Sequence, residues 1–139
     1  MHGEETVKPE SQSQEVVANF FRAMETADGT AFAAALADDV TWTAPKELPF
    51  GGIYRGKEAV LNDMRAEVAP LFTEPAKIEL LSLVGTGSVV AAEFIGRRKT
   101  ATGRDYENHY VEVFEIEGDQ IKAVRQYMDT HHFITRCYD

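Results

Sequence analysis

Cysteine, positive charge and long apolar runs are scarce in this sequence of 139 residues. The one cysteine, Cys137, cannot form an internal disulfide, and a lone thiol is typical of a reducing compartment, so we expect a cytoplasmic protein. The formal net charge of −9 repels phosphate backbones, which argues against nucleic acid as a partner. No apolar run approaches the length of a membrane span, and residues 1–14 lack the apolar core of a signal peptide. We therefore expect neither a membrane partner nor secretion.

Apolar residues make up 44% of the chain and charged residues 27%, which is ordinary for a globular protein with one core. Residues 1–12 are polar, and we expect them to form a disordered tail. Residues 13–139 contain no internal repeat and no low-complexity stretch, so they are expected to form a single domain.

Three helices are expected in the first half of the chain. Ser11 and Gln14 fit a capping box, and apolar residues then recur at helical spacing as far as Asp28. Thr30 is a suitable cap for a short second helix. Apolar residues four apart predict a third helix over residues 57–69.

Strands account for most of the remaining chain, and a loop rich in proline and glycine is expected at residues 45–56. Helices that precede consecutive strands indicate an α+β fold. We expect a strongly curved, mainly antiparallel sheet that wraps around the three helices as a cone and encloses a pocket. The predicted strands are residues 40–43, 78–84, 88–98, 106–116 and 121–128.

The strand predicted at residues 106–116 holds the clearest candidate for a functional side chain. Successive side chains of a strand point to opposite faces, so Asn108, Tyr110, Glu112 and Phe114 share one face. An acid in this apolar company is unusual, because burial of an unpaired carboxylate is costly. Loss of hydration should raise the pKa of Glu112 and keep it protonated.

Four segments of the chain, in this order and spacing, resemble the nuclear-transport-factor-2-like superfamily, specifically its SnoaL-like and ketosteroid-isomerase-like branch. They are LADDVTW at 36–42, LPFGGIYRGKEAV at 48–60, YENHYVEVFEIEGDQI at 106–121 and VRQYMD at 124–129. The resemblance covers residues 15–133 and implies the same cone-shaped fold. That fold hosts isomerases, dehydratases, epoxide hydrolases, cyclases and non-catalytic binders, so it implies no single activity.

The resemblance also shows which catalytic residues of ketosteroid isomerases are replaced here. Their general-base Asp falls at Ala44, and their oxyanion-hole Tyr falls at Phe20. Their second, protonated acid falls at Glu112, which is still a carboxylic acid.

Limonene epoxide hydrolases give a similar result. Their Arg-x-Asp motif falls at Glu93 and Ile95, and their second Asp falls at Gln126. The phenazine-biosynthesis relatives also carry an acid where this chain has Gln126. The chain therefore lacks both full catalytic sets, and we expect neither of the two standard activities.

We expect the site residues on the concave face of the sheet and on the first helix. The predicted catalytic residues are Glu112 and Glu93, two like charges in one space that could run acid–base chemistry without a cofactor. The side chains predicted to bind the substrate are Trp42, Tyr110, Asn108, Gln126, Met128, Ile95, Val124 and Phe20.

Several of these side chains also have an ordinary structural alternative. Glu93 can be an exposed or ion-paired strand residue, and Trp42 and Tyr110 can belong to the core. Asn108 can satisfy backbone groups instead of a substrate.

Two groups of polar residues outside this face carry weaker signals. His131 and His132 follow the last strand close to Asp129, but no further ligand has suitable spacing, so we expect no metal. The basic run of residues 97–99 lies near a turn and is expected to be a solvated strand edge.

The favoured function is therefore binding of a small apolar molecule, aromatic or polycyclic, with a cofactor-independent isomerase, lyase or cyclase activity that acts through Glu112. The alternative is a non-catalytic ligand binder or a dimeric scaffold of the same fold, which the missing base and hydroxyl favour. Val111, Val113 and Tyr127 share an outer sheet face that no helix is left to cover, and this predicts a homodimer.

Overall fold

The computed structural model describes residues 7–138. The first six residues of the tail predicted at 1–12 lie outside the described residues, and α1 already begins at Gln12. The helices are α1 (Gln12–Glu25), α2 (Gly29–Ala35), α3 (Arg65–Val68) and α4 (Thr130–Cys137), with a π-helical segment (Ala59–Met64) before α3 and a 3₁₀ turn (Ala69–Leu71) after it. The strands are β1 (Leu36–Ala44), β2 (Gly52–Arg55), β3 (Lys77–Val84), β4 (Val89–Lys99), β5 (Asp105–Glu117) and β6 (Gln120–Met128).

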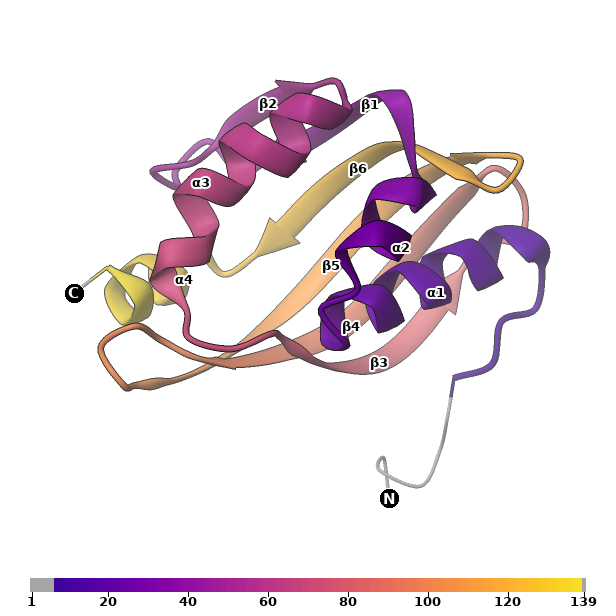
Figure 1. Ribbon diagram of the computed structural model, residues 1–139. Coiled ribbons are helices and arrows are strands. Elements are labelled where there is room, and N and C mark those ends of the chain that lie inside the picture. Colours follow the sequence, from indigo (N-terminus) through magenta and orange to yellow (C-terminus); the bar gives the residue numbers. More distant parts are fainter. Residues whose placement is uncertain (1–6, 139) are drawn as a thin grey trace.

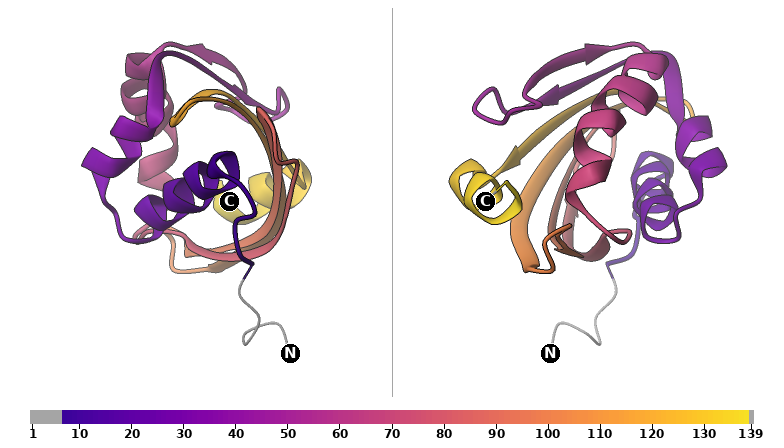
Figure 2. Two further views of the ribbon diagram at one scale, coloured as in Figure 1. Left: turned by 90° about the vertical axis from the view of Figure 1, so that its right-hand side faces the viewer. Right: turned by 60° about the vertical axis from the view of Figure 1, so that its left-hand side comes forward.

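One six-stranded sheet carries the fold, with the strand order β2-β1-β6-β5-β4-β3 (Figure 1). Neighbouring strands are antiparallel except for β1 and β6, which run parallel. Figure 2 (left) shows the sheet curling around α1, while α2 and the helical segment that contains α3 lie on the open side of the curve. The predicted α+β cone around three N-terminal helices is therefore confirmed.

Side-chain hydrogen bonds determine where the first helices begin. Ser11 Oγ accepts a hydrogen bond from the backbone N–H of Gln14 at 3.2 Å, which confirms the predicted start of α1. The Gln14 side chain does not close the capping box; its Nε2 donates to the carbonyl of Gly85 at 2.8 Å and ties α1 to the turn between β3 and β4. The predicted cap of α2, Thr30, was wrong, because Asp28 accepts the N–H of the first turn instead.

Two elements were not predicted from the sequence. The strand β2 lies inside the expected loop at 45–56 and pairs with β1. It could not be predicted, because four residues are too few to show an alternating pattern. The helix α4 follows β6 and begins at Thr130, after the capping residue Asp129, whose side chain accepts a backbone N–H of the first turn. Its buried Phe133 packs edge-on against Phe50 and Tyr106 and closes one end of the cone.

The core lies between the concave face of the sheet and the helices. Phe20 of α1 packs against Phe32 of α2, Trp42 of β1 and Phe114 of β5, with ring centroids 4.6, 6.1 and 5.9 Å away. Along β5 every second residue from Tyr106 onward is buried, so the predicted alternation is confirmed.

Within residues 7–138, no helix is long and apolar enough to cross a membrane.

Candidate functional site

A cavity of about 270 Å³ lies between the concave face of the sheet and the helices. Its wall is mostly apolar and aromatic and takes side chains from all four helices and from β1, β3, β4, β5 and β6. The predicted internal pocket is therefore present. The polar side chains on its wall are Arg65, Arg98, Tyr106, Tyr110, Glu112 and Gln126.

Glu112 is the acidic side chain on this wall in the described residues, and only 1% of its surface is exposed. It pairs across the sheet with Gln126, whose Nε2 donates to Glu112 Oε2 at 3.0 Å. The other carboxyl oxygen, Oε1, has no hydrogen-bond partner in the described part of the chain. Burial raises the pKa of Glu112 to about 8, and the hydrogen bond from Gln126 offsets only part of that effect. The acid is therefore neutral at pH 7 and can donate a hydrogen bond from Oε1.

Trp42 supplies a second buried polar atom on the same wall. Its indole Nε1 also lacks a partner among residues 7–138. Trp42 pairs with Val124 of β6, two positions before Gln126 on the same face of that strand. The unpartnered indole N–H and the unpartnered carboxyl oxygen thus belong to residues that flank β6 on the concave face, at positions two residues apart along that strand.

Two tyrosines of β5 form a further polar group on the wall. Their hydroxyls are hydrogen-bonded to each other at 2.6 Å, and Asn108 Nδ2 donates to Tyr106 Oη at 2.9 Å. Asn108 also donates to the carbonyl of Asp129 at 3.0 Å and accepts from the N–H of His109, which fixes its orientation. Burial raises the pKa of both tyrosines, so both stay protonated at neutral pH.

Arg98 occupies the same end of the cavity as the two tyrosines. Its guanidinium lies over the ring of Phe72, with 4.0 Å from Cζ to the ring centroid, and Nε and Nη2 donate to the carbonyl of Glu74. Loss of hydration lowers its pKa, although an arginine remains charged. Its neighbours Arg97 and Lys99 pair with carboxylates at the surface. Residues 97 and 99 are therefore solvated as predicted, whereas Arg98 is not. The predicted strand edge was wrong, because β4 lies between β3 and β5 and pairs with both.

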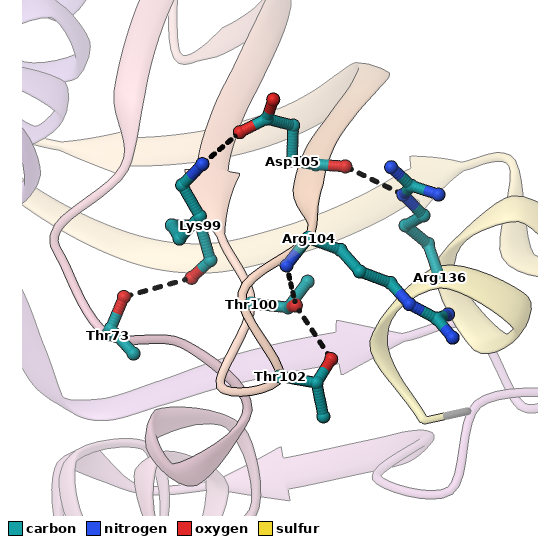
Figure 3. A network of polar contacts seen from close by, with 7 residues as sticks. All are labelled: Thr73, Lys99, Thr100, Thr102, Arg104, Asp105 and Arg136. Carbon is teal, nitrogen blue, oxygen red and sulfur yellow. Dashed lines mark hydrogen bonds and ion pairs between the residues drawn. The ribbon is translucent and has the colours of Figure 1, made fainter.

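Polar contacts hold this end of the cavity in place. Figure 3 shows the turn between β4 and β5, where Thr100 Oγ1 accepts the N–H of Arg104 at 3.0 Å and Arg136 of α4 donates to the carbonyl of Asp105 at 2.7 Å. On the other side of the turn, Thr73 donates to the carbonyl of Lys99. The chain on both sides of the turn that follows Arg98 is thus tied to neighbouring elements.

The structure brings together half of the side chains predicted for the site. Asn108 lies behind the wall and bonds Tyr106 and the backbone, which is the structural alternative considered for it. Phe20 and Val124 are buried in the core and do not line the cavity. The predicted residues that line the cavity are Trp42, Tyr110, Glu112, Gln126 and Met128.

The inward placement of Glu93 and Ile95 was wrong. In the antiparallel pair of β4 and β5, Glu93 lies opposite Val111 and Ile95 opposite His109, and both partners are on the outer face. The side chain of Glu93 is 42% exposed and bonds His109 Nε2 at 2.7 Å and Ser82 Oγ at 3.2 Å. The ion-paired alternative for Glu93 is therefore the correct one, and the two acids do not share one space.

The residues of β4 that do face the cavity are Phe94, Gly96 and Arg98. Phe94 lies opposite Tyr110 and stacks on it, with ring centroids 5.0 Å apart and an interplanar angle of 1°. A Cβ atom on Gly96 would lie 3.1 Å from Tyr110 Cε1, so the glycine leaves room for that ring. The alternation of β4 could have identified these residues only in combination with its register against β5.

The histidines after β6 do not form a metal site. Asp129 caps α4 and accepts the backbone N–H of His132, and His132 Nε2 lies 2.9 Å from the carbonyl oxygen of Glu107. Within the described residues, no group of three or more His, Cys, Asp and Glu side chains is arranged to hold a metal ion.

Comparison with known proteins places this geometry in a wider group. The sequence profile of the SnoaL-like domain matches residues 17–124, whereas no functionally curated protein matches the chain significantly. An NTF2-like protein of unknown function from Burkholderia pseudomallei shares 22% identity and a TM-score of 0.84, over 93% of this chain and 99% of that one. TerC, co-crystallized with polyporic acid, shares 16% identity and a TM-score of 0.80, over 93% and 100% of the two chains. Bal32a, from a soil-derived mobile gene cassette, shares 16% identity and a TM-score of 0.78, over 91% and 96%.

At these identities the structural neighbours show the fold, whereas the profile match covers most of the chain. Both agree with the resemblance seen in the four sequence segments. The chain belongs to the SnoaL-like domain family, and its fold is that of NTF2-like proteins.

Proposed function

We propose that the cavity binds a small, largely apolar molecule with polar groups at its edge. The observation that carries this proposal is a pair of buried polar atoms without partners, Glu112 Oε1 and Trp42 Nε1, in side chains that line one cavity. Buried polar groups are hydrogen-bonded in the great majority of cases, so two unsatisfied groups in one apolar pocket favour a ligand that completes them. The indole N–H requires an acceptor, and the protonated carboxyl group can donate to one or accept from a donor.

The dimensions and walls of the cavity support a compact ring system. Its volume of about 270 Å³ is at the lower end of the range of about 300–1,000 Å³ that is usual for ligand pockets. An adjoining recess of about 250 Å³ shares five lining residues with it, so a longer molecule could extend outward. Co-crystallization of the structural neighbour TerC with polyporic acid supports binding of a small organic molecule by this fold.

A second candidate function is cofactor-independent acid–base catalysis on the bound molecule. Glu112 favours it, because a carboxyl group with a pKa of about 8 exchanges its proton close to neutral pH. Among the described lining residues, Glu112 is the only acid, so it has no carboxylate partner. The tyrosine pair supplies donors that could stabilise negative charge on a ligand oxygen. A non-catalytic binder uses the same groups for recognition alone.

The single tryptophan allows a direct test of binding. In a ¹H–¹⁵N NMR titration, the one indole N–H resonance should shift and saturate as 2-naphthamide is added. Glu93→Gln on the outer face is the matched control and should leave this titration unchanged. If the indole resonance stays in place for 2-naphthamide and for other compact ring compounds, and none of them raises the melting temperature, the proposal is wrong.

The outer face of the sheet supports a homodimer. Val111 is 37% exposed and Tyr127 is 54% exposed, and these two residues are paired on adjacent strands. A large apolar side chain exposed in this way favours burial against a partner surface. We therefore propose that a second copy covers this face, and that the protein works in a reducing cytoplasm, which suits its single free cysteine.

A further inference from the structure

We propose that the end of the cavity bounded by Arg98, Tyr106 and Tyr110 recognises an anionic group, so that the ligand is a small ring-bearing carboxylic acid. This inference rests on the proposed function, because it specifies the chemical class of the molecule that the cavity binds. It requires a carboxylate at this end and an apolar body along the remaining wall.

Counting hydrogen atoms in the tyrosine pair gives the first reason. Asn108 uses both amide hydrogens, one on Tyr106 Oη at 2.9 Å and one on the carbonyl of Asp129 at 3.0 Å. Tyr106 Oη therefore accepts from Asn108, and the 2.6 Å bond between the two hydroxyls uses one of their two hydrogens. Whichever tyrosine donates in that bond, the other keeps one O–H hydrogen that no acceptor among residues 7–138 takes. Both side chains line the cavity, so this hydrogen is available to a ligand oxygen.

The guanidinium of Arg98 gives the second reason. Its Nε and Nη2 donate to the carbonyl of Glu74, at 3.3 and 3.1 Å, and its plane lies over Phe72. Within the described part of the chain, no carboxylate lies within salt-bridge distance of it. A half-buried charge without an anion is costly, and a carboxylate in the cavity would offset that cost. Nη1 makes no hydrogen bond with residues 7–138 and can donate to a ligand, and guanidinium groups match the geometry of carboxylates.

The two reasons concern the same place in the fold. Arg98 lies directly opposite Tyr106 in the pairing of β4 with β5, and Tyr110 lies two positions further along the same face of β5, after Asn108. Arg98 also lines the adjoining recess, together with Arg65, whose guanidinium lies 5.8 Å from the ring centroid of Phe32. A second positive charge is therefore present where the two hollows meet.

Acidic groups near this end do not cancel the effect. Glu112 is the one acid on the cavity wall in the described residues, and burial keeps it protonated at neutral pH. Asp28 lines the outer recess, but its side chain accepts the N–H of Ala31 as the cap of α2. The net charge of −9 is spread over the chain and is screened over about 8–10 Å at ordinary salt. The preference for an anionic ligand group at this end is therefore determined by the nearby donors, Arg98 and the tyrosine pair.

A matched pair of probes tests the inference by calorimetric titration. 2-Naphthoate and 2-naphthamide share one ring system and differ in charge. The wild-type protein should bind the carboxylate about tenfold more tightly than the amide, because a charge-assisted hydrogen bond contributes more than a neutral one. Arg98→Gln should remove that preference and leave the affinity for the amide within about threefold. Arg97→Gln, on the neighbouring outward position, should keep the preference.

The outcomes separate this inference from the proposed function. Equal affinities of the wild-type protein for the two probes would overturn the anion site and leave ligand binding intact. A preference that survives in a folded Arg98→Gln variant, which still binds the amide, would also overturn it. If Arg98→Gln does not fold, the wild-type ratio of the two affinities decides. If neither probe binds the folded wild-type protein, the proposed function fails, and the anion site fails with it.

Discussion

Replacement of Glu112 by Gln should stabilise the protein, and the gain should depend on pH. The substitution preserves the shape of the protonated side chain, and the new amide oxygen can still accept the hydrogen bond from Gln126 Nε2, which is 3.0 Å from Glu112 Oε2. The amide, however, can never ionise. The difference between the two proteins therefore measures the cost of ionising Glu112 within the fold.

The expected magnitude follows from the burial of the carboxyl group. In the unfolded chain Glu112 has its ordinary pKa of 4.5, and in the folded chain its pKa is about 8. Because the folded state holds the proton more tightly, the stability of the wild-type protein falls as pH rises from 4.5 to about 8 and then levels off. At about 1.4 kcal/mol per pH unit, the full effect is about 4–5 kcal/mol, and entry of water on ionisation reduces it toward about 3 kcal/mol.

Urea unfolding of both proteins between pH 5 and pH 9 measures this difference. Glu112→Gln should be within about 1 kcal/mol of the wild type at pH 5 and about 3–5 kcal/mol more stable at pH 9. Glu93→Gln is the control, because it removes an exposed ion pair with His109 and should lose less than about 1 kcal/mol. A difference between Glu112→Gln and the wild type that is constant across this pH range would refute the reasoning, since it would mean that Glu112 titrates alike in both states.

Two further predictions concern the wall of the cavity and the outer face. Gly96→Ala should lower the free energy of unfolding by about 1–3 kcal/mol, because its Cβ would lie 3.1 Å from Tyr110 Cε1. Thermal unfolding measures this loss, and the control is Gly87→Ala, where an added Cβ meets nothing within 4 Å. Equal losses of stability in the two variants would contradict the tight fit at Gly96. Light scattering at micromolar concentration should give the mass of a homodimer. The double variant Val111→Glu, Tyr127→Glu should be a monomer, because it places charges on the apolar outer face. A monomeric wild-type protein would rule out this interface.

Local patterns in the sequence were sufficient for much of the fold. The start of α1 could be predicted because Ser11 makes its hydrogen bond within one helical turn. The two faces of β5 could be predicted because alternation holds through thirteen residues without a break. The strand β2 could not, because its four residues are a strand only through pairing with β1. The helix α4 is similarly defined by the packing of Phe133 at the end of the cone.

Glu112 and Tyr110 could be placed from the pattern of one strand, whereas the placement of Glu93 and Arg98 depended on the pairing of two. Glu112 and Tyr110 follow from the alternation of β5 alone. The faces of β4 depend on its register with β5, and a shift of one residue exchanges them, so Glu93 was placed inside and Arg98 outside. The same register places Glu93 and Ile95, where the Arg-x-Asp motif of limonene epoxide hydrolases was expected to fall, on the outer face of the sheet.

Among residues 7–138, Glu112 is the one acid that lines the cavity, and this restricts the chemistry that the protein could catalyse. Hydrolysis by a paired acid and base requires one protonated group that acts as the acid and one deprotonated group that acts as the base. Glu93 cannot be the partner of Glu112, because it bonds His109 on the outer face. A lone carboxyl group with a pKa of about 8 can accept a proton from one atom of a ligand and return it to another. The spare hydroxyl hydrogen of the tyrosine pair could meanwhile stabilise charge on a ligand oxygen. If the cavity is catalytic, proton relocation within one molecule therefore fits its groups better than attack by an activated water.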